Sequence, residues 1–197
     1  MAVRSVDPID RGVWEVARWR AHVRRHPLRY HLVVIAPTAA EVVRYAGGWV
    51  FDRASAGWEV TALVAECSNV RPLGILGATV LDLEQALTVL ERDMHPNAVA
   101  VASQTYLSDD RVCAGVHEYL DSRPVEVALW GEGLPTELDD RIEPVSHRMS
   151  NAARVFKTCA LAAAGFPGES PEATEAFRTR ELPPPSCRYD GDLVSAK

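Results

Sequence analysis

Residues 31–66 constrain the fold more than any other part of the chain, because they predict a strand, a helix and a second strand in direct succession. Residues 31–36 form a short apolar run typical of a buried strand, and Pro37 ends that strand because it has no N–H to donate to a sheet. A helix is expected next, as far as Gly57, and residues 59–65 are rich in residue types that favour strands. Units of this kind predict an α/β domain.

The helix carries specific signals at both ends. Thr38 and Glu41 have the spacing of a capping box, in which the hydroxyl accepts from the Glu41 amide and the carboxylate accepts from the amide of Thr38. Gly57 suits the position just after a helix, where the left-handed backbone conformation is common. We therefore predict a helix from Thr38 to about Gly57.

Later segments continue the alternation of strands and helices. Strands are predicted at 71–77, 97–102 and 125–130, a short strand or extended segment at 141–145, and helices at 82–93, 108–121 and 146–164. Parallel strands need crossover connections, and these are right-handed in nearly all proteins. We therefore predict a Rossmann-like α/β fold with a largely parallel sheet, helices on both faces and a single domain.

Size and composition fit one domain with two extensions. The chain has 197 residues, 47% of them hydrophobic, which is enough to bury one sizeable core. Residues 1–30 predict a basic N-terminal helical arm, and residues 31–165 predict the α/β domain. Residues 166–197 include Pro167 and the triple proline at 183–185, which predict a tail that is either disordered or extended along the surface.

Charge is distributed unevenly along the chain. The net charge of −6 argues against a general nucleic-acid binder, which needs a surplus of Lys and Arg over its binding face. The first 30 residues carry seven arginines and three acidic residues, a net of +4, which leaves −10 on the remainder. The chain is therefore predicted to have a basic arm on an acidic body.

Within the arm, residues 13–26 have a helical composition with two faces. Trp14, Ala17 and Ala21 mark one face, and the other carries four arginines: Arg18, Arg20, Arg24 and Arg25. These arginines are a candidate docking surface for an acidic protein partner or a nucleic acid. The alternative that we favour is that the tryptophan face packs on the domain and the arginines are solvated, because an apolar stripe usually marks a core face.

Two classes of protein receive no support. No apolar run approaches the roughly 20 residues that a bilayer-spanning helix needs, and the N-terminus lacks an apolar signal-peptide stretch, so we expect a cytoplasmic protein without membrane contact. The four cysteines are far apart and have no neighbouring histidine pair at zinc-site spacing, so we expect free thiols and no metal framework.

The segment after the first predicted strand resembles the PIG-L/LmbE family of zinc-dependent N-acetylglucosaminyl de-N-acetylases. In that family the first strand runs into the motif P-H-P-D-D-E, followed by a helix with a Gly-Gly pair, a later glycine and the triplet E-V-T. Here Pro37 takes the first proline, Gly47 and Gly48 the pair, Gly57 the later glycine, and residues 59–61 the triplet. The spacing matches, since Gly48 lies 11 residues after Pro37 and Gly57 nine after Gly48.

Shorter similarities extend over residues 31–165. Residues 95–101 are similar to the family's R-P-D-V-V strand, and residues 110–112 fall where the family has the H-R-A-V that follows H-P-D-H. Residues 140–143 and the helix that contains Lys157 resemble the D-I-T and K-x-x-A segments. The resemblance implies the same α/β fold and, in the family, zinc-dependent hydrolysis.

The residues that carry the chemistry in the family are replaced. The resemblance implies that the family's zinc-binding His, second Asp and last His correspond to Thr38, Glu41 and Asp110, and that its general base corresponds to Ala40. Threonine with two carboxylates is a poor set of zinc ligands, and alanine has no proton acceptor. We therefore expect no cofactor and no catalytic residue, with zinc as the alternative cofactor.

Three functional hypotheses follow. The first is a non-catalytic PIG-L/LmbE-like protein that binds a ligand or a protein, with Thr38, Glu41 and Asp110 as the candidate ligand pocket. The second is a metal-dependent amide or sugar hydrolase with an altered metal site built from Glu41 and Asp110. The third is an interaction module that works through the basic N-terminal helix. A simpler interpretation of Glu41 and Asp110, which we favour, is that both belong to helix first turns.

Overall fold

In the computed structural model, residues 12–25, 30–90, 96–122, 125–180 and 193–195 are described, and they form one mixed sheet covered by helices. The strand order is β3-β2-β1-β4-β5-β7-β6-β8; the first five of these are parallel, and β7, β6 and β8 are antiparallel. The strands are β1 (His31–Thr38), β2 (Glu59–Glu66), β3 (Thr79–Asp82), β4 (Ala98–Ala102), β5 (Glu126–Trp130), β6 (Glu143–Arg148), β7 (Thr174–Thr179) and β8 (Leu193–Ser195).

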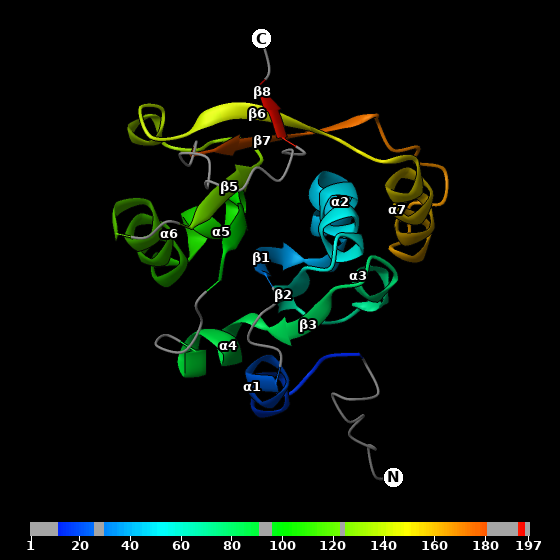
Figure 1. Cartoon of the computed structure of the whole chain (residues 1–197), viewed down its shortest axis with the longest axis horizontal. Coiled ribbons are helices and arrows are strands. Elements are labelled where there is room, and N and C mark those ends of the chain that lie inside the picture. The colour runs from blue at the N-terminus through cyan, green and yellow to red at the C-terminus, as the bar shows by residue number, and fades with distance from the viewer. Residues whose placement is uncertain (1–11, 26–29, 91–95, 123–124, 181–192, 196–197) are drawn as a thin grey trace.

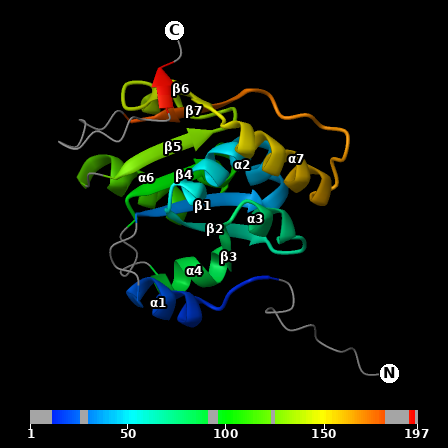
Figure 2. The same cartoon turned by 45° about the vertical axis from the view of Figure 1, so that its right-hand side comes forward.

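Helices pack on both faces of this sheet, as Figures 1 and 2 show. One face carries α2 (Ala39–Ser55), α3 (Arg71–Ile75) and α7 (Asn151–Ala163), which contact one another. The other face carries α1 (Val16–Arg25), α4 (Leu83–Leu90), α5 (Ser103–Ser108) and α6 (Asp110–Ser122), and a 3-10 turn, η2 (Thr136–Leu138), lies between β5 and β6. The predicted Rossmann-like α/β fold is confirmed.

The core alternates along β1. Leu32 and Val34 belong to the core cluster under α2, whereas Val33 and Ile35 belong to the cluster under α4 and α6. This is the pattern of a strand buried on both faces, in which successive side chains point to opposite sides. Strand order reverses between β1 and β4, and ligands of open α/β sheets commonly bind at the carboxyl ends of the strands at such a point.

The signals predicted for the two ends of α2 are confirmed in part. The Thr38 hydroxyl accepts a hydrogen bond from the Glu41 amide at 3.1 Å. Gly57 follows the C-cap of α2 with a φ of 89°, which only glycine adopts without strain. The reciprocal half of the capping box is not among the hydrogen bonds of the described residues, and the Glu41 carboxyl interacts with Trp130 instead.

The prediction of a strand at 71–77 is wrong. Residues 71–75 form the short helix α3, and the edge strand follows at 79–82. Pro72 lies in the first turn of α3, where its fixed φ suits a helix and its missing N–H costs nothing. Gly77, with a φ of 84°, then reverses the chain into the strand.

Three further details differ from the prediction, the first being that β1 continues past Pro37 to Thr38, which pairs with Glu66 of β2. The helix predicted from residue 146 begins at Asn151, because β6 continues through Arg148 and the Ser150 hydroxyl caps the helix by accepting from Ala153 at 3.0 Å. Helix α5 was not predicted, since residues 103–108 form one short turn directly after β4.

The sheet also extends into the segment predicted as a tail. Thr174–Thr179 forms β7, which lies between β5 and β6, and Phe177 is buried in the core under α2. Alternate residues of β7 are buried, which is the period of a half-buried strand. The tail was predicted because prolines occur on either side of this strand. The proline run at 183–185 lies outside the described residues.

The N-terminal helix packs on the domain, partly through the predicted face, since Trp14 just before the helix is half-buried against the core cluster. Val16 and Trp19 are buried against the sheet, whereas Ala17 and Ala21 are exposed. Trp19 donates from Nε1 to the Thr61 hydroxyl at 2.9 Å. A partner interaction through Arg18, Arg20, Arg24 and Arg25 stays a prediction, and the side chains of Arg24 and Arg25 lie outside the described residues.

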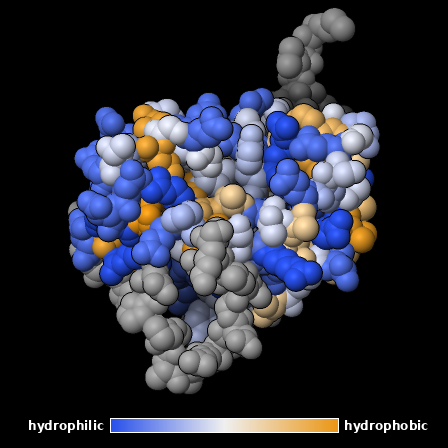
Figure 3. Space-filling view, turned by 90° about the horizontal axis from the view of Figure 1, so that it is seen from above, coloured by the Kyte–Doolittle hydropathy of each residue, from blue (hydrophilic) through white to orange (hydrophobic). Residues whose placement is uncertain are grey.

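The distribution of apolar residues on the surface is that of an ordinary folded domain. On the face shown in Figure 3, apolar residues form separate areas among hydrophilic ones, as on most protein surfaces. None of the described helices has the length and apolar character that a bilayer-spanning helix needs.

Candidate functional site

Thr38 and Glu41 lie together where β1 passes into α2, at the carboxyl end of the parallel sheet. The Thr38 hydroxyl is used as the helix cap, as described above. Glu41 is half-buried, and this burial raises the pKa of its carboxyl, while a weaker interaction with the Trp130 indole lowers it. Trp130 is the last residue of β5 and is buried, and its Nε1 makes no hydrogen bond of regular geometry with the described residues.

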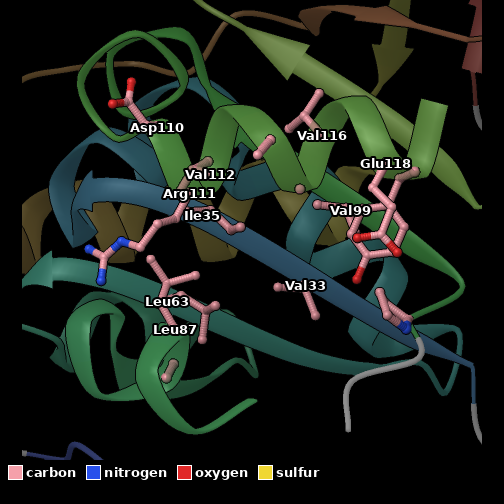
Figure 4. Close-up of a pocket in the computed structure, with 15 residues that line it drawn as sticks. Val33, Ile35, Leu63, Leu87, Val99, Asp110, Arg111, Val112, Val116 and Glu118 are labelled. Atoms are coloured by element: carbon pink, nitrogen blue, oxygen red, sulfur yellow. The ribbon is translucent and has the colours of Figure 1, made fainter. Parts of the chain in front are cut away.

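Asp110 occupies a different place. It is the first residue of α6 and borders a groove between α4, α6 and the sheet, and neither Thr38 nor Glu41 is among the residues that line this groove. In Figure 4 its carboxylate points away from the apolar side chains below it. The structure therefore brings Thr38 and Glu41 together in one cap, and the single pocket that would join them to Asp110 stays a prediction.

The resemblance assigns Thr38, Glu41 and Asp110 to the family's metal positions, and this set lacks the histidines that zinc prefers. The Thr38 hydroxyl already accepts the Glu41 amide, and Asp110 lines a groove that neither Thr38 nor Glu41 lines. Zinc prefers imidazole, thiolate and carboxylate ligands in a tetrahedral arrangement. Within the described part of the chain, no three His, Cys, Asp or Glu side chains come together as a metal ion would require.

Two buried polar residues that follow β4, Ser103 and Thr105, were not among the predicted site residues. Ser103 follows β4 and Gly131 follows β5, and a Cβ added to Gly131 would lie 2.3 Å from the Ser103 hydroxyl oxygen. Ser103 is buried, and so is Thr105, whose hydroxyl has no partner among the described residues. Ser103 directly follows a predicted strand, where parallel sheets place functional side chains, and Thr105 lies two residues further along the chain.

The cysteine nearest to this end of the sheet is unreactive by its surroundings. Cys67 follows β2, and burial together with the nearby Asp82 carboxylate raises the pKa of its thiol to about 11. A nucleophilic cysteine needs a lowered pKa. Cys67, Cys113 and Cys159 are free thiols as predicted; Cys159 is exposed, and Cys187 lies outside the described residues.

A buried ion pair lies against the middle of α2. Lys157 Nζ of α7 donates to Glu175 Oε1 of β7 at 2.6 Å and to the Arg44 carbonyl at 2.6 Å. Glu175 also accepts from the backbone amides of Gly48 and Trp49, each at 2.8 Å. Both charged side chains are almost fully buried. The ion pair therefore ties α7 and β7 to the backbone of α2.

The Gly-Gly pair of α2 explains how these groups reach the helix. A Cβ on Gly48 would lie 2.0 Å from Met149 Sδ and 3.2 Å from Glu175 Oε1, whereas one on Gly47 would meet Leu76 Cδ1 at 3.2 Å. The structure thus favours close packing over a ligand approach as the reason for this pair.

We expect Gly48→Ala to lower the free energy of unfolding by about 2 kcal/mol, because Met149 must leave its place in the core. Gly47→Ala is the matched control and should change stability little, since its nearest contact is the end of a flexible leucine. Urea denaturation of both variants measures the difference. Equal stabilities for the two would show that Met149 yields without cost.

Comparison with known proteins supports the fold. No family model and no curated protein matches the chain. Among solved structures, the zinc-inhibited form of teicoplanin deacetylase Orf2 has a TM-score of 0.52 at 10% identity, covering 77% of this chain and 99% of that one. The A40926 pseudoaglycone deacetylase Dbv21 has a TM-score of 0.50 at 12% identity, covering 78% and 98%.

A third solved structure belongs to a different class of enzyme. The 4-carboxy-2-hydroxymuconate hydratase GalB from Pseudomonas putida KT2440 has a TM-score of 0.50 at 11% identity, covering 82% of this chain and 100% of that one. The chain therefore shares its α/β fold with two deacetylases and a hydratase. At such identities the likeness concerns the fold and not the reaction.

Proposed function

We propose that this chain is a non-catalytic protein of PIG-L/LmbE-like fold that acts by binding a ligand or a protein. The observation that carries the proposal is the pair Thr38 and Ala40 at the positions that the resemblance assigns to a zinc ligand and the general base. A methyl group cannot accept a proton from water, and the Thr38 hydroxyl is already used by the helix cap. The deacetylases among the structural neighbours support the proposal in one respect, because they have the same fold. Under the proposal, this chain has kept that fold and lost deacetylase activity.

The test is a direct assay of the purified chain. We expect no stoichiometric zinc by elemental analysis and no release of acetate from N-acetylglucosamine derivatives above the level of a Glu41→Ala variant. Acetate release by the wild-type chain that is abolished in Glu41→Ala, with unchanged thermal unfolding, would contradict the proposal.

The second candidate is a hydrolase of amide or sugar substrates, and one observation favours it. The half-buried Glu41 carboxyl has a raised pKa at the carboxyl end of the sheet, and a carboxyl of this kind can act as a general acid or base. Zinc is the alternative cofactor that this hypothesis would need. In that case the activity should follow the titration of Glu41 with pH and should vanish in Glu41→Gln.

A further inference from the structure

One groove that the described residues line lies on the face of the sheet opposite α2. It lies between α4 and α6, and Figure 4 shows apolar side chains from the sheet and α6 directed into it. Its floor comes from β1, β2 and β4, through Val33, Leu63 and Val99. This groove is separate from the cap formed by Thr38 and Glu41, neither of which lines it.

Size and lining are those of a small-molecule site. The cavity volume is about 530 Å³, within the range of about 300–1,000 Å³ that is usual for ligand pockets. Val112 and Val116 of α6 and Leu87 of α4 form its walls. Burial of an apolar ligand against such walls is favourable, at about 25 cal/mol for each Å² removed from water.

The charges at the rim decide which ligands fit. Arg111 of α6 reaches across to α4 and donates to both carboxylate oxygens of Glu84, at 2.9 and 2.7 Å. It also bonds Asp109 at 2.8 Å, so its guanidinium already faces two carboxylates. Glu118 adds a further carboxylate to the lining, whereas the Asp110 carboxylate points away from the apolar side chains. A ligand carboxylate or phosphate would thus meet an excess of negative charge.

We propose that the groove between α4 and α6 is a binding site for an uncharged apolar small molecule. The apolar floor and walls supply affinity, and the acidic rim excludes anionic amphiphiles such as fatty acids. The site does not depend on whether the chain has lost catalysis, because none of the groups at Thr38, Ala40 and Glu41 takes part in it.

Gly115 provides a sharp test of this site. It lies in α6 on the groove wall, and a Cβ added there would meet no atom within 4 Å. Gly115→Leu therefore adds an apolar side chain on the groove wall at a position where its Cβ meets no neighbouring atom. Gly74→Leu is the matched control, because Gly74 is also helical with open space around it but lies in α3, outside the groove.

The probe is the neutral dye N-phenyl-1-naphthylamine, titrated into the purified full-length chain by fluorescence. We expect saturable binding to wild type and to Gly74→Leu, and a Kd raised about tenfold or more in Gly115→Leu. The anionic dye 1-anilinonaphthalene-8-sulfonate should bind more weakly than the neutral one. Circular dichroism and thermal unfolding confirm that both variants are folded.

Three results would overturn the proposal. The first is absence of saturable binding to wild type, and the second is equal affinity in wild type and Gly115→Leu. The third is a wild-type dimer in sedimentation experiments that dissociates in Gly115→Leu, which would make a second copy of the chain the occupant. Acetate release is measured separately, so failure of this site and failure of the proposed function are distinguishable.

Discussion

Glu175→Ala is expected to lower the free energy of unfolding by about 3–5 kcal/mol, because it leaves the buried Lys157 ammonium without its carboxylate. Lys157 would keep only the Arg44 carbonyl as a partner. The amides of Gly48 and Trp49 would also lose their acceptor, and an unsatisfied buried donor adds a cost of about 1–3 kcal/mol. An effect of this size is a large fraction of the stability of a single domain.

Glu175→Gln removes the negative charge of this side chain and keeps its size and shape. Both carboxylate oxygens accept backbone amides, and an amide side chain has only one acceptor oxygen, so Gln directs an N–H at Gly48 or Trp49. We therefore expect this isosteric variant to be destabilised as well.

The matched control is Glu169→Ala. Glu169 also pairs with a basic side chain, since it accepts from Arg44 Nε at 3.2 Å, but both partners are exposed. Exposed pairs contribute about 0–1 kcal/mol. Urea or thermal unfolding of the variants gives the comparison. If Glu175→Ala cost no more than Glu169→Ala, the buried pair would have no special role.

Stability should fall by about 3 kcal/mol as the pH drops from 6.5 to 4, because burial lowers the pKa of His31 to about 4 in the folded chain. Between these values the unfolded chain binds a proton at His31 and the folded chain does not, so acid favours unfolding. The contribution is fully present above pH 6.5 and is lost as the pH falls toward 4. Glu59 opposes the shift by raising the same pKa.

His31 belongs to a buried network that includes the N-terminal helix. Trp19 can only donate, so the Thr61 hydroxyl accepts from it and has its own proton available for His31 Nε2, 2.9 Å away. We assign neutral His31 as the acceptor on this basis. Protonation gives Nε2 a hydrogen in place of its lone pair, so the Thr61 hydroxyl must turn its own proton elsewhere and the buried imidazolium must be kept without water.

The measurement is the free energy of unfolding from urea titrations at several pH values between 7 and 4. His31→Leu removes the titrating group and should flatten the dependence in this window, whatever its stability at neutral pH. A wild-type stability that is constant between pH 6.5 and 4 would contradict the assignment.

Local signals predicted the elements that local chemistry determines. Thr38 marks the start of α2 and Gly57 its end, since a hydroxyl cap and a left-handed glycine act within a few residues. Strand β7 was missed because its place depends on pairing with β5 and β6, which no short window contains. The ion pair between Lys157 and Glu175 could not be predicted from a short window either, because Glu175 accepts from amides more than 120 residues earlier in the chain.

The candidate site was predicted less completely than the fold. The relation of Thr38 to Glu41 follows from three-residue spacing and is confirmed. Trp130 beside Glu41 depends on the placement of β5, which is fixed by the order of strands in the sheet. The groove between α4 and α6 results from the separation of two helices, for which periodicity within either helix gives no signal.

The position of Glu175 also affects how the chain can fold during translation. Gly48 and Trp49 leave the ribosome early, yet the carboxylate that accepts their amides is made far later. Until then Lys157, too, has no counter-ion in the core. The contacts that tie α7 and β7 to the backbone of α2 can therefore form only after β7 has been synthesised.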